Sequence, residues 1–115
     1  MRTLNDYFLT VKLANVSTSS SAYVVAPDNG KIIKISSVLG GAITGGNAAI
    51  TCEINGAAVT GAGLTITHSG SAAGDVDTSF PTAANNVLEG DVIELITNGG
   101  STNTHSLEFT IVIRR

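Results

Sequence analysis

The chain has 115 residues and a formal net charge of −3 at pH 7, and 43% of its residues are hydrophobic while 13% are charged. This length suits one domain, and the composition excludes intrinsic disorder, which requires low hydrophobicity together with high net charge. The apolar runs, such as Ile111–Ile113, are far shorter than the roughly 20 residues that a membrane-spanning helix needs. The sequence therefore predicts one soluble globular domain without a membrane partner.

The six lysine and arginine residues are spread along the sequence instead of forming one basic stripe. Nucleic-acid binding depends on clustered cations that displace counterions from phosphates, so no nucleic-acid partner is predicted. The single cysteine, Cys52, cannot form an internal disulfide, and the N-terminal residues lack the apolar core of a signal peptide. We therefore expect synthesis in a cytoplasm.

Alternation of apolar and polar residues begins near the N-terminus, where it predicts a strand over Asp6–Asn15. A polar hinge, Ser17–Ser21, follows it. We therefore divide the chain into an N-terminal arm with its hinge, residues 1–21, and a β-sandwich domain, residues 22–115. A strand beyond a hinge can pair with its own sheet or reach a neighbouring copy. The predicted apolar face of this first strand comprises Tyr7, Leu9, Val11 and Leu13.

Further strands are predicted at residues 22–26, 31–39, 48–54, 64–67, 92–97 and 106–115. In the second of these, Ile33, Ile35 and Leu39 are predicted to share one face. Asn55-Gly56 fits a type I′ hairpin turn, because both central positions of that turn need a positive φ. No stretch has the period of a helix. Seven or eight short strands predict an all-β chain forming a single antiparallel β-sandwich, jelly-roll-like in its topology.

Candidate chemistry is sparse. Cys52 alternates with Ile50 and Ile54, which indicates a small buried hydrophobe rather than a nucleophile. Asp75 and Asp77, which Asp91 could approach in the fold, could bind calcium or act as an acid–base pair. The favoured interpretation is a solvated acidic turn. The two histidines have no companions at metal-ligand spacing. We therefore predict no enzyme activity, no cofactor and no metal.

Two segments, Tyr23–Gly61 and Ala73–Arg115, resemble small structural proteins encoded in tailed-bacteriophage genomes. The pieces that carry the resemblance are "AP-x-x-GKI", "INGxxVTG", "PTxAN-x-V-x-x-GD-x-IE", "T-x-GGSTN" and the final strand TIVIRR. Together they cover about four fifths of the chain, whereas residues 1–22 show no such likeness.

This resemblance implies a capsid decoration (cement) protein of β-sandwich or jelly-roll type. Its expected partner is the major capsid protein, its expected assembly a homotrimer, and its expected place the exterior of the virion after synthesis in the host cytoplasm. No catalytic residue comes with the resemblance. The alternatives are a head-fibre or tail-associated adhesion or carbohydrate-binding module, and, as a distant third, a glycan hydrolase using Asp75, Asp77 or Asp91.

Two groups of residues are predicted to make the contacts. Residues 1–15 are expected to reach the capsid or a neighbouring protomer. The loops at residues 40–46 and 98–104 are expected at one end of the sandwich, where loops commonly carry contacts. The interface residues that we predict are Tyr7, Phe8, Leu9, Val11, Leu13, Thr44 and Asn103.

Overall fold

The structure is a computed structural model that describes residues 6–115. These residues form two five-stranded antiparallel sheets, and they contain no helix that could cross a membrane. Sheet A contains β1 (Asp6–Leu13), β3 (Gly30–Leu39), β7 (Val76–Ser79), β8 (Asn86–Val87) and β10 (Leu107–Arg114). Sheet B contains β2 (Ser20–Val25), β4 (Ala48–Ile54), β5 (Ala57–Ala58), β6 (Leu64–Ile66) and β9 (Val92–Thr97).

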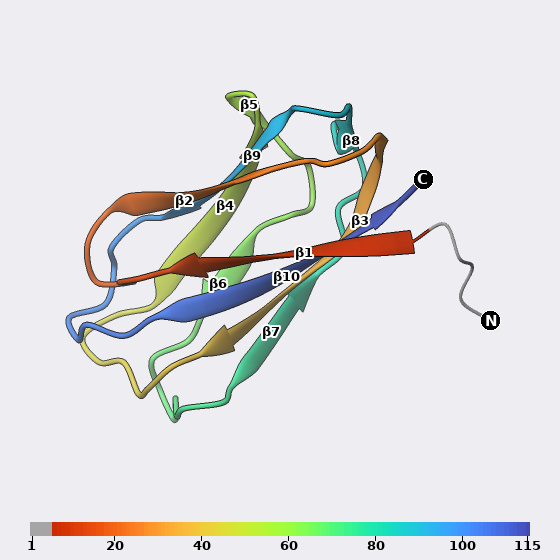
Figure 1. The fold of residues 1–115 in the computed structure, drawn as a ribbon. Helices are drawn as coiled ribbons and strands as arrows, with labels where there is room; N and C mark the ends of the chain where they lie inside the picture. Colours follow the sequence, from red (N-terminus) through yellow and green to blue (C-terminus); the bar gives the residue numbers. More distant parts are fainter. Residues whose placement is uncertain (1–5) are drawn as a thin grey trace.

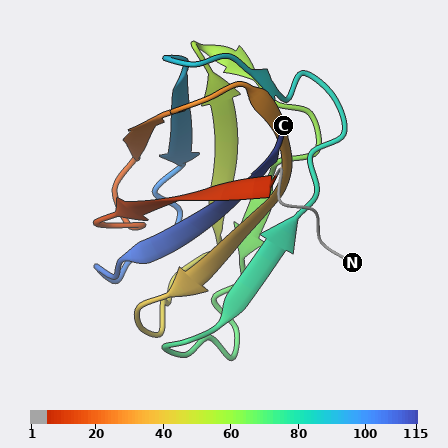
Figure 2. The same ribbon diagram turned by 45° about the vertical axis from the view of Figure 1, so that its right-hand side comes forward.

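The connections between the strands give a jelly roll. The order in sheet A is β1-β10-β3-β7, with β8 also paired to β3, and the order in sheet B is β2-β9-β4-β5, with β6 also paired to β4. The first four strands alternate between the two sheets, as in a jelly roll. Figures 1 and 2 show the two sheets as layers facing each other. The predicted fold class is confirmed.

Alternating side chains build the core between the sheets. In β10, Leu107, Phe109, Ile111 and Ile113 are all buried, while the residues between them point away from the core. The residues of β4 alternate in the same way, with Cys52 among the buried ones. Strand β9 contributes buried Ile93 and Leu95 from sheet B. Burial of this apolar area is the main force that holds the two sheets together.

Strand β1 lies in the sandwich of its own chain. All eight of its residues pair with β10, from Asp6 opposite Arg114 to Leu13 opposite Leu107. Leu13 and, just beyond the strand, Val16 are buried in the core. Residues 6–21 are therefore part of the same folded body as the rest of the chain, whereas residues 1–5 of the predicted arm lie outside the described residues.

A β-bulge in β3 reverses the orientation that was predicted for Ile33. Val112 of β10 is opposite Lys34, but the next residue, Ile113, is opposite Ile32, so Ile33 has no partner on β10. The extra residue shifts the alternation by one. Ile32 takes the buried place that was predicted for Ile33, and Ile33 remains partly exposed.

The predicted turn at Asn55-Gly56 is confirmed. Asn55 has a φ of 50° and Gly56 a φ of 85°, as the two central positions of a type I′ turn require. The described residues form ten strands rather than seven or eight, and the additional short ones include β5 and β8 with two residues each.

Candidate functional site

The outer face of sheet A carries three rows of side chains, each crossing neighbouring strands in register. The middle row consists of hydroxyl side chains, in which Ser36 Oγ and Thr78 Oγ1 lie 3.1 Å apart. The rows on either side of it contain exposed apolar side chains, including Phe8 and Val76, which are 68% and 66% exposed. The rows comprise Phe8, Val112 and Lys34; Thr10, Thr110, Ser36 and Thr78; and Lys12, Glu108, Val38 and Val76.

This outer face is weakly charged and shallowly hollowed. Lys12 and Glu108, which have opposite charges, are cross-strand partners. A hollow of about 330 Å³ lies beside Phe8 and Val112, and a second of about 270 Å³ lies beside Lys12 and Val38. Exposed apolar side chains around a nearly neutral centre are typical of a surface that contacts another protein.

The structure divides the predicted interface residues of β1 between two faces. Leu13 is buried, and Tyr7, Leu9 and Val11 pack against the core cluster. Phe8 is therefore the large apolar residue of this set that β1 presents outward. The apolar face of β1 belongs to the protein's own core, and its opposite face contributes to the outer face of sheet A.

Tyr7 anchors the start of β1. Its hydroxyl donates a hydrogen bond to the carbonyl oxygen of Asp28 at 2.7 Å, and the Arg115 guanidinium lies 5.6 Å from its ring centroid. Burial and the neighbouring Asp28 raise the pKa of Tyr7, and Arg115 opposes them. These contacts tie β1 to the turn before β3.

The two predicted contact loops lie side by side at one end of the sandwich, at the lower left of Figure 1. Thr44 Oγ1 donates to Asn103 Oδ1 at 2.8 Å, and the backbone N–H of Thr102 donates to the carbonyl of Thr44 at 2.9 Å. Gly45 has a φ of 80°, and a Cβ there would meet the Thr102 side chain. Thr44 and Asn103 thus hold the two loops to each other, and their predicted role in binding remains a prediction.

The three aspartates do not come together, so the possible approach of Asp91 to the other two does not occur. Asp75 and Asp77 line a small hollow near the end of β3. Asp91 lies in the turn beside the start of β3, where its carboxylate accepts hydrogen bonds from Asn55 and from the backbone of Leu88. Strand β3 spans about 30 Å at about 3.3 Å per residue, which separates the two sites. Among residues 6–115, no three acidic, histidine or cysteine side chains gather as metal ligands.

The environment of Cys52 matches the prediction of a small buried hydrophobe. The residue is 2% exposed, and its thiol pKa is raised to about 12 by burial first and then by Glu53 and Glu94. A thiol in such surroundings is protonated and inert.

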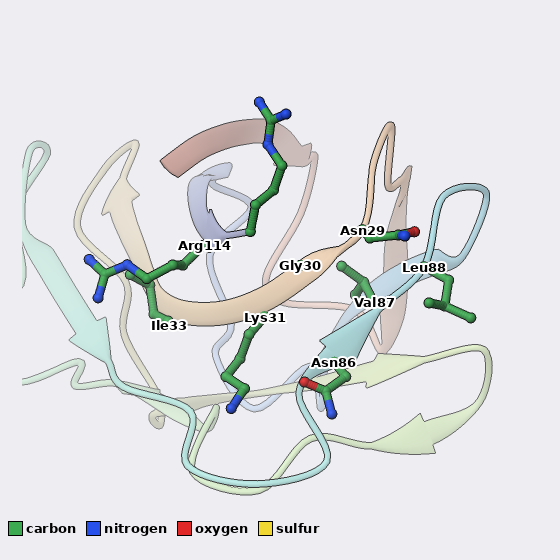
Figure 3. A pocket seen from close by; sticks show the side chains of 9 residues that line it. Asn29, Gly30, Lys31, Ile33, Asn86, Val87, Leu88 and Arg114 are labelled. Atoms are coloured by element: carbon green, nitrogen blue, oxygen red, sulfur yellow. The ribbon is translucent and has the colours of Figure 1, made fainter. Parts of the chain in front are cut away.

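A larger hollow, of about 720 Å³, opens where β3 and β8 begin and β10 ends. It was not predicted, because the β-bulge that turns Ile33 toward it leaves no mark in the sequence pattern. Figure 3 shows Lys31, Asn86, Val87 and Leu88 around it. The lining residues are Asn29, Gly30, Lys31, Ile33, Asn86, Val87, Leu88, Arg114 and Arg115.

The outer face of sheet B differs from that of sheet A. Tyr23 is 63% exposed and pairs with Glu94, which is itself opposite Glu53 on β4. Ser21 Oγ donates to Glu94 Oε2 at 2.5 Å. This row places one exposed aromatic ring next to a carboxylate, with a second carboxylate one strand further away.

Together, the fold and these surfaces define a small jelly-roll β-sandwich whose outer sheet A face carries exposed apolar side chains on both sides of a row of hydroxyls. No protein-family model matches the chain, and no curated protein matches it in sequence. Solved structures match it in fold. A chain of the acid-stable capsid structure of the Helicobacter pylori bacteriophage KHP30 aligns with a TM-score of 0.61 and 12% identity, over 96% of this chain and 87% of that chain.

Two further similar structures act on or bind sugars. A carbohydrate-binding module from Clostridium stercorarium, solved with cellobiose, aligns with a TM-score of 0.58 and 10% identity over 99% of this chain and 86% of that chain. The catalytic unit of an α-1,3-glucanase from Streptomyces thermodiastaticus aligns with a TM-score of 0.56 and 12% identity. This chain spans 26% of the glucanase chain, so the similarity concerns one part of that enzyme. At these identities, all three likenesses establish the fold.

Proposed function

We propose that this protein is a capsid decoration protein, which binds the outer surface of an assembled phage shell and stabilises the lattice without catalysing a reaction. The observation that carries the proposal is the outer face of sheet A, a broad and nearly neutral surface on which Phe8, Val38 and Val76 are exposed. The resemblance of residues 23–61 and 73–115 to small phage structural proteins supports it. The fold match to a capsid chain of comparable length is in keeping with it.

The mechanism is linkage between binding and assembly. A protein that binds the assembled shell, but not its dissociated subunits, stabilises the shell by RT ln(1 + [L]/Kd) for each site. A homotrimer presents three outer faces at once, so its modest contacts combine into tight attachment. We propose this trimer as the binding form, and native mass spectrometry of the purified chain tests it: a monomer at micromolar concentration contradicts it.

The main test is co-sedimentation with purified shells that lack this protein. We expect near-stoichiometric binding relative to the major capsid protein and an increased melting temperature of the shells. Phe8→Ala should weaken binding about tenfold, as truncation of an aromatic interface anchor commonly does. Tyr23→Ala is the matched control, since Tyr23 is exposed to a similar extent but lies on sheet B. Absence of binding, or equal loss in both variants, contradicts the proposal.

A carbohydrate-binding module is the second candidate, because exposed Tyr23 stands beside Glu94 on sheet B and the sandwich matches a module solved with cellobiose. For this function the same two variants exchange roles. Tyr23→Ala should abolish binding of gluco-oligosaccharides in calorimetric titration, while Phe8→Ala should retain it. Absence of any heat of binding with the unmodified protein excludes this candidate for those sugars.

A further inference from the structure

We propose that the hollow between β8 and the end of β10 binds an acidic peptide segment of a partner protein, in which a carboxylate stands next to an apolar side chain. The inference rests on the proposed function only in naming that partner as the shell protein. The chemistry of the hollow is argued from its own residues.

A gap in the edge of sheet A produces the hollow. Strand β7 covers β3 from Ile35 to Val38, and β8 covers it only at Gly30 and Lys31. Between these two, Asn85 bonds both backbone groups of Ile32, accepting from its N–H at 2.9 Å and donating to its carbonyl at 2.6 Å. Within the described residues, no strand pairs with Ile33 or Lys34 on this side. In the described part of the chain, strand β3 is therefore without a strand partner on this side over these two residues, and the hollow opens beside them.

The lining of the hollow combines apolar walls with a basic rim. Ile33, turned outward by the β-bulge, provides partly exposed apolar surface, and Leu88 is 63% exposed on the other side, whereas Val87 between them is 1% exposed and belongs to the core. The rim contains Lys31 and Arg114, whose Cα atoms are opposite each other on β3 and β10. Such a lining accepts an apolar side chain and a carboxylate together.

One cation on the rim is unpaired within the described part of the chain, which suits a ligand with a single carboxylate. Three of the six lysine and arginine residues, Lys31, Arg114 and Arg115, line this hollow in a chain whose net charge is −3. Arg114 Nε forms a salt bridge with Asp6 Oδ1 at 2.9 Å, and Arg115 Nη1 forms one with Asp28 Oδ2 at 3.1 Å. Lys31 forms no salt bridge with any residue in the described range 6–115, so its charge is available to a carboxylate.

A peptide fits the hollow better than a nucleic acid does. A nucleic acid needs a basic groove that follows several phosphates, whereas here two of the three cations are neutralised and Glu89, in the adjacent turn, adds a negative charge. The apolar walls give no advantage to phosphate. A carboxylate beside a leucine or valine uses both Lys31 and the surface of Leu88.

The test is an NMR titration of the full chain with two capped pentapeptides, Gly-Leu-Asp-Leu-Gly and its neutral analogue Gly-Leu-Asn-Leu-Gly. We expect millimolar binding of the first, with amide shifts concentrated at Lys31, Ile33 and Leu88. The neutral analogue and the variant Lys31→Glu should each bind about fivefold more weakly. Lys12→Glu, the same charge change elsewhere on sheet A, should leave the affinity unchanged.

Leu88→Ala tests the apolar surface of the hollow and should weaken binding of the aspartate peptide. Val25→Ala, which truncates another exposed apolar side chain, should leave that binding unchanged. Three results overturn the inference: equal binding of both peptides, the same shifts at the same affinity with inorganic phosphate alone, or the same shifts on raising protein concentration without peptide. The last would mean that a second copy occupies the hollow.

Co-sedimentation separates this inference from the proposed function. If the unmodified protein and Lys31→Glu bind shells equally, the hollow is not the shell contact and the inference fails, while the decoration role stands. If the unmodified protein does not bind shells, the decoration role fails, and the peptide titration still decides what the hollow binds.

Discussion

At the scale of single residues, Cys52 shows how its surroundings suppress reactivity. Burial, reinforced by Glu53 and Glu94, raises the pKa of its thiol to about 12, so almost no thiolate forms near neutral pH. We expect a maleimide reagent to label Cys52 slowly in the folded protein and at the rate of an ordinary thiol in urea, as followed by mass spectrometry. Labelling of the folded protein at the unfolded rate would contradict this burial.

Asp77 and Asp91 should shift stability with pH in opposite directions. Burial and then Asp75 raise the pKa of Asp77, so its ionised form disfavours the fold above the usual aspartate pKa of about 3.9. Hydrogen bonds from Leu88 and Asn55 lower the pKa of Asp91, so its stabilising contribution is present above that value and is lost as pH falls through its folded pKa.

We therefore expect Asp77→Asn to stabilise the protein near neutral pH and Asp91→Asn to destabilise it. Urea unfolding from neutral to acidic pH measures both variants against the unmodified chain. The Asp77→Asn difference should fade once the pH lies below its unfolded pKa, and the Asp91→Asn difference should shrink as the pH falls below its folded pKa. Changes of the same sign in both variants would contradict the two shifts.

At the scale of elements, clear alternation made β4, β9 and β10 predictable from sequence, because each has one face buried and one turned outward. Strand β7 was not predicted, since its residues Val76–Ser79 are few and mostly polar, and it is a strand only because β3 pairs with it. Ile33 was assigned to the wrong face because a bulge depends on the partner strand. Alternation is a local property, whereas pairing and bulges are decided by tertiary contacts.

The turn between β4 and β5 gives an isolated test of backbone conformation. Gly56 has a φ of 85°, and a Cβ there would meet nothing within 4 Å, so Gly56→Ala changes only the backbone energy. We expect a loss of about 1–2 kcal/mol in the free energy of unfolding. Gly63→Ala is the control, because its nearest contact would be 3.7 Å from Ile50 and no positive φ is required. Equal effects in the two variants would contradict a type I′ turn.

Strand β1 should be indispensable to the fold. Deleting residues 1–16 removes buried Leu13 and Val16, each worth about 1.5–3 kcal/mol, and uncovers the edge of β10. Since small domains are stable by only about 5–15 kcal/mol, we expect the truncated chain to unfold or aggregate, as seen by circular dichroism and light scattering. Phe8→Ala should melt like the unmodified protein. A truncated chain with native-like melting would show that β1 is a separable arm.

At the scale of the whole molecule, the sequence predicted the architecture more fully than the surfaces. Strand periodicity indicated a jelly roll, but it did not indicate that β1 would use its apolar face internally and leave Phe8 beside Val112 on sheet A. Asp75 and Asp91 illustrate the same point, since the length of β3 separates them. Where surfaces meet depends on how strands from distant parts of the chain are ordered.

That order also has a mechanical consequence, because Asp6 and Arg114 lie opposite each other at one end of the β1–β10 ladder. Pulling these two residues apart opens the ladder one residue pair at a time. Lys12 and Arg114 lie near opposite ends of the ladder, so pulling those two apart shears the strands and puts force on all the pairs at once. We expect optical tweezers to find a lower rupture force for handles at residues 6 and 114 than for handles on Lys12→Cys and Arg114→Cys. The sandwich should therefore resist tension along its strands far better than peeling from this corner.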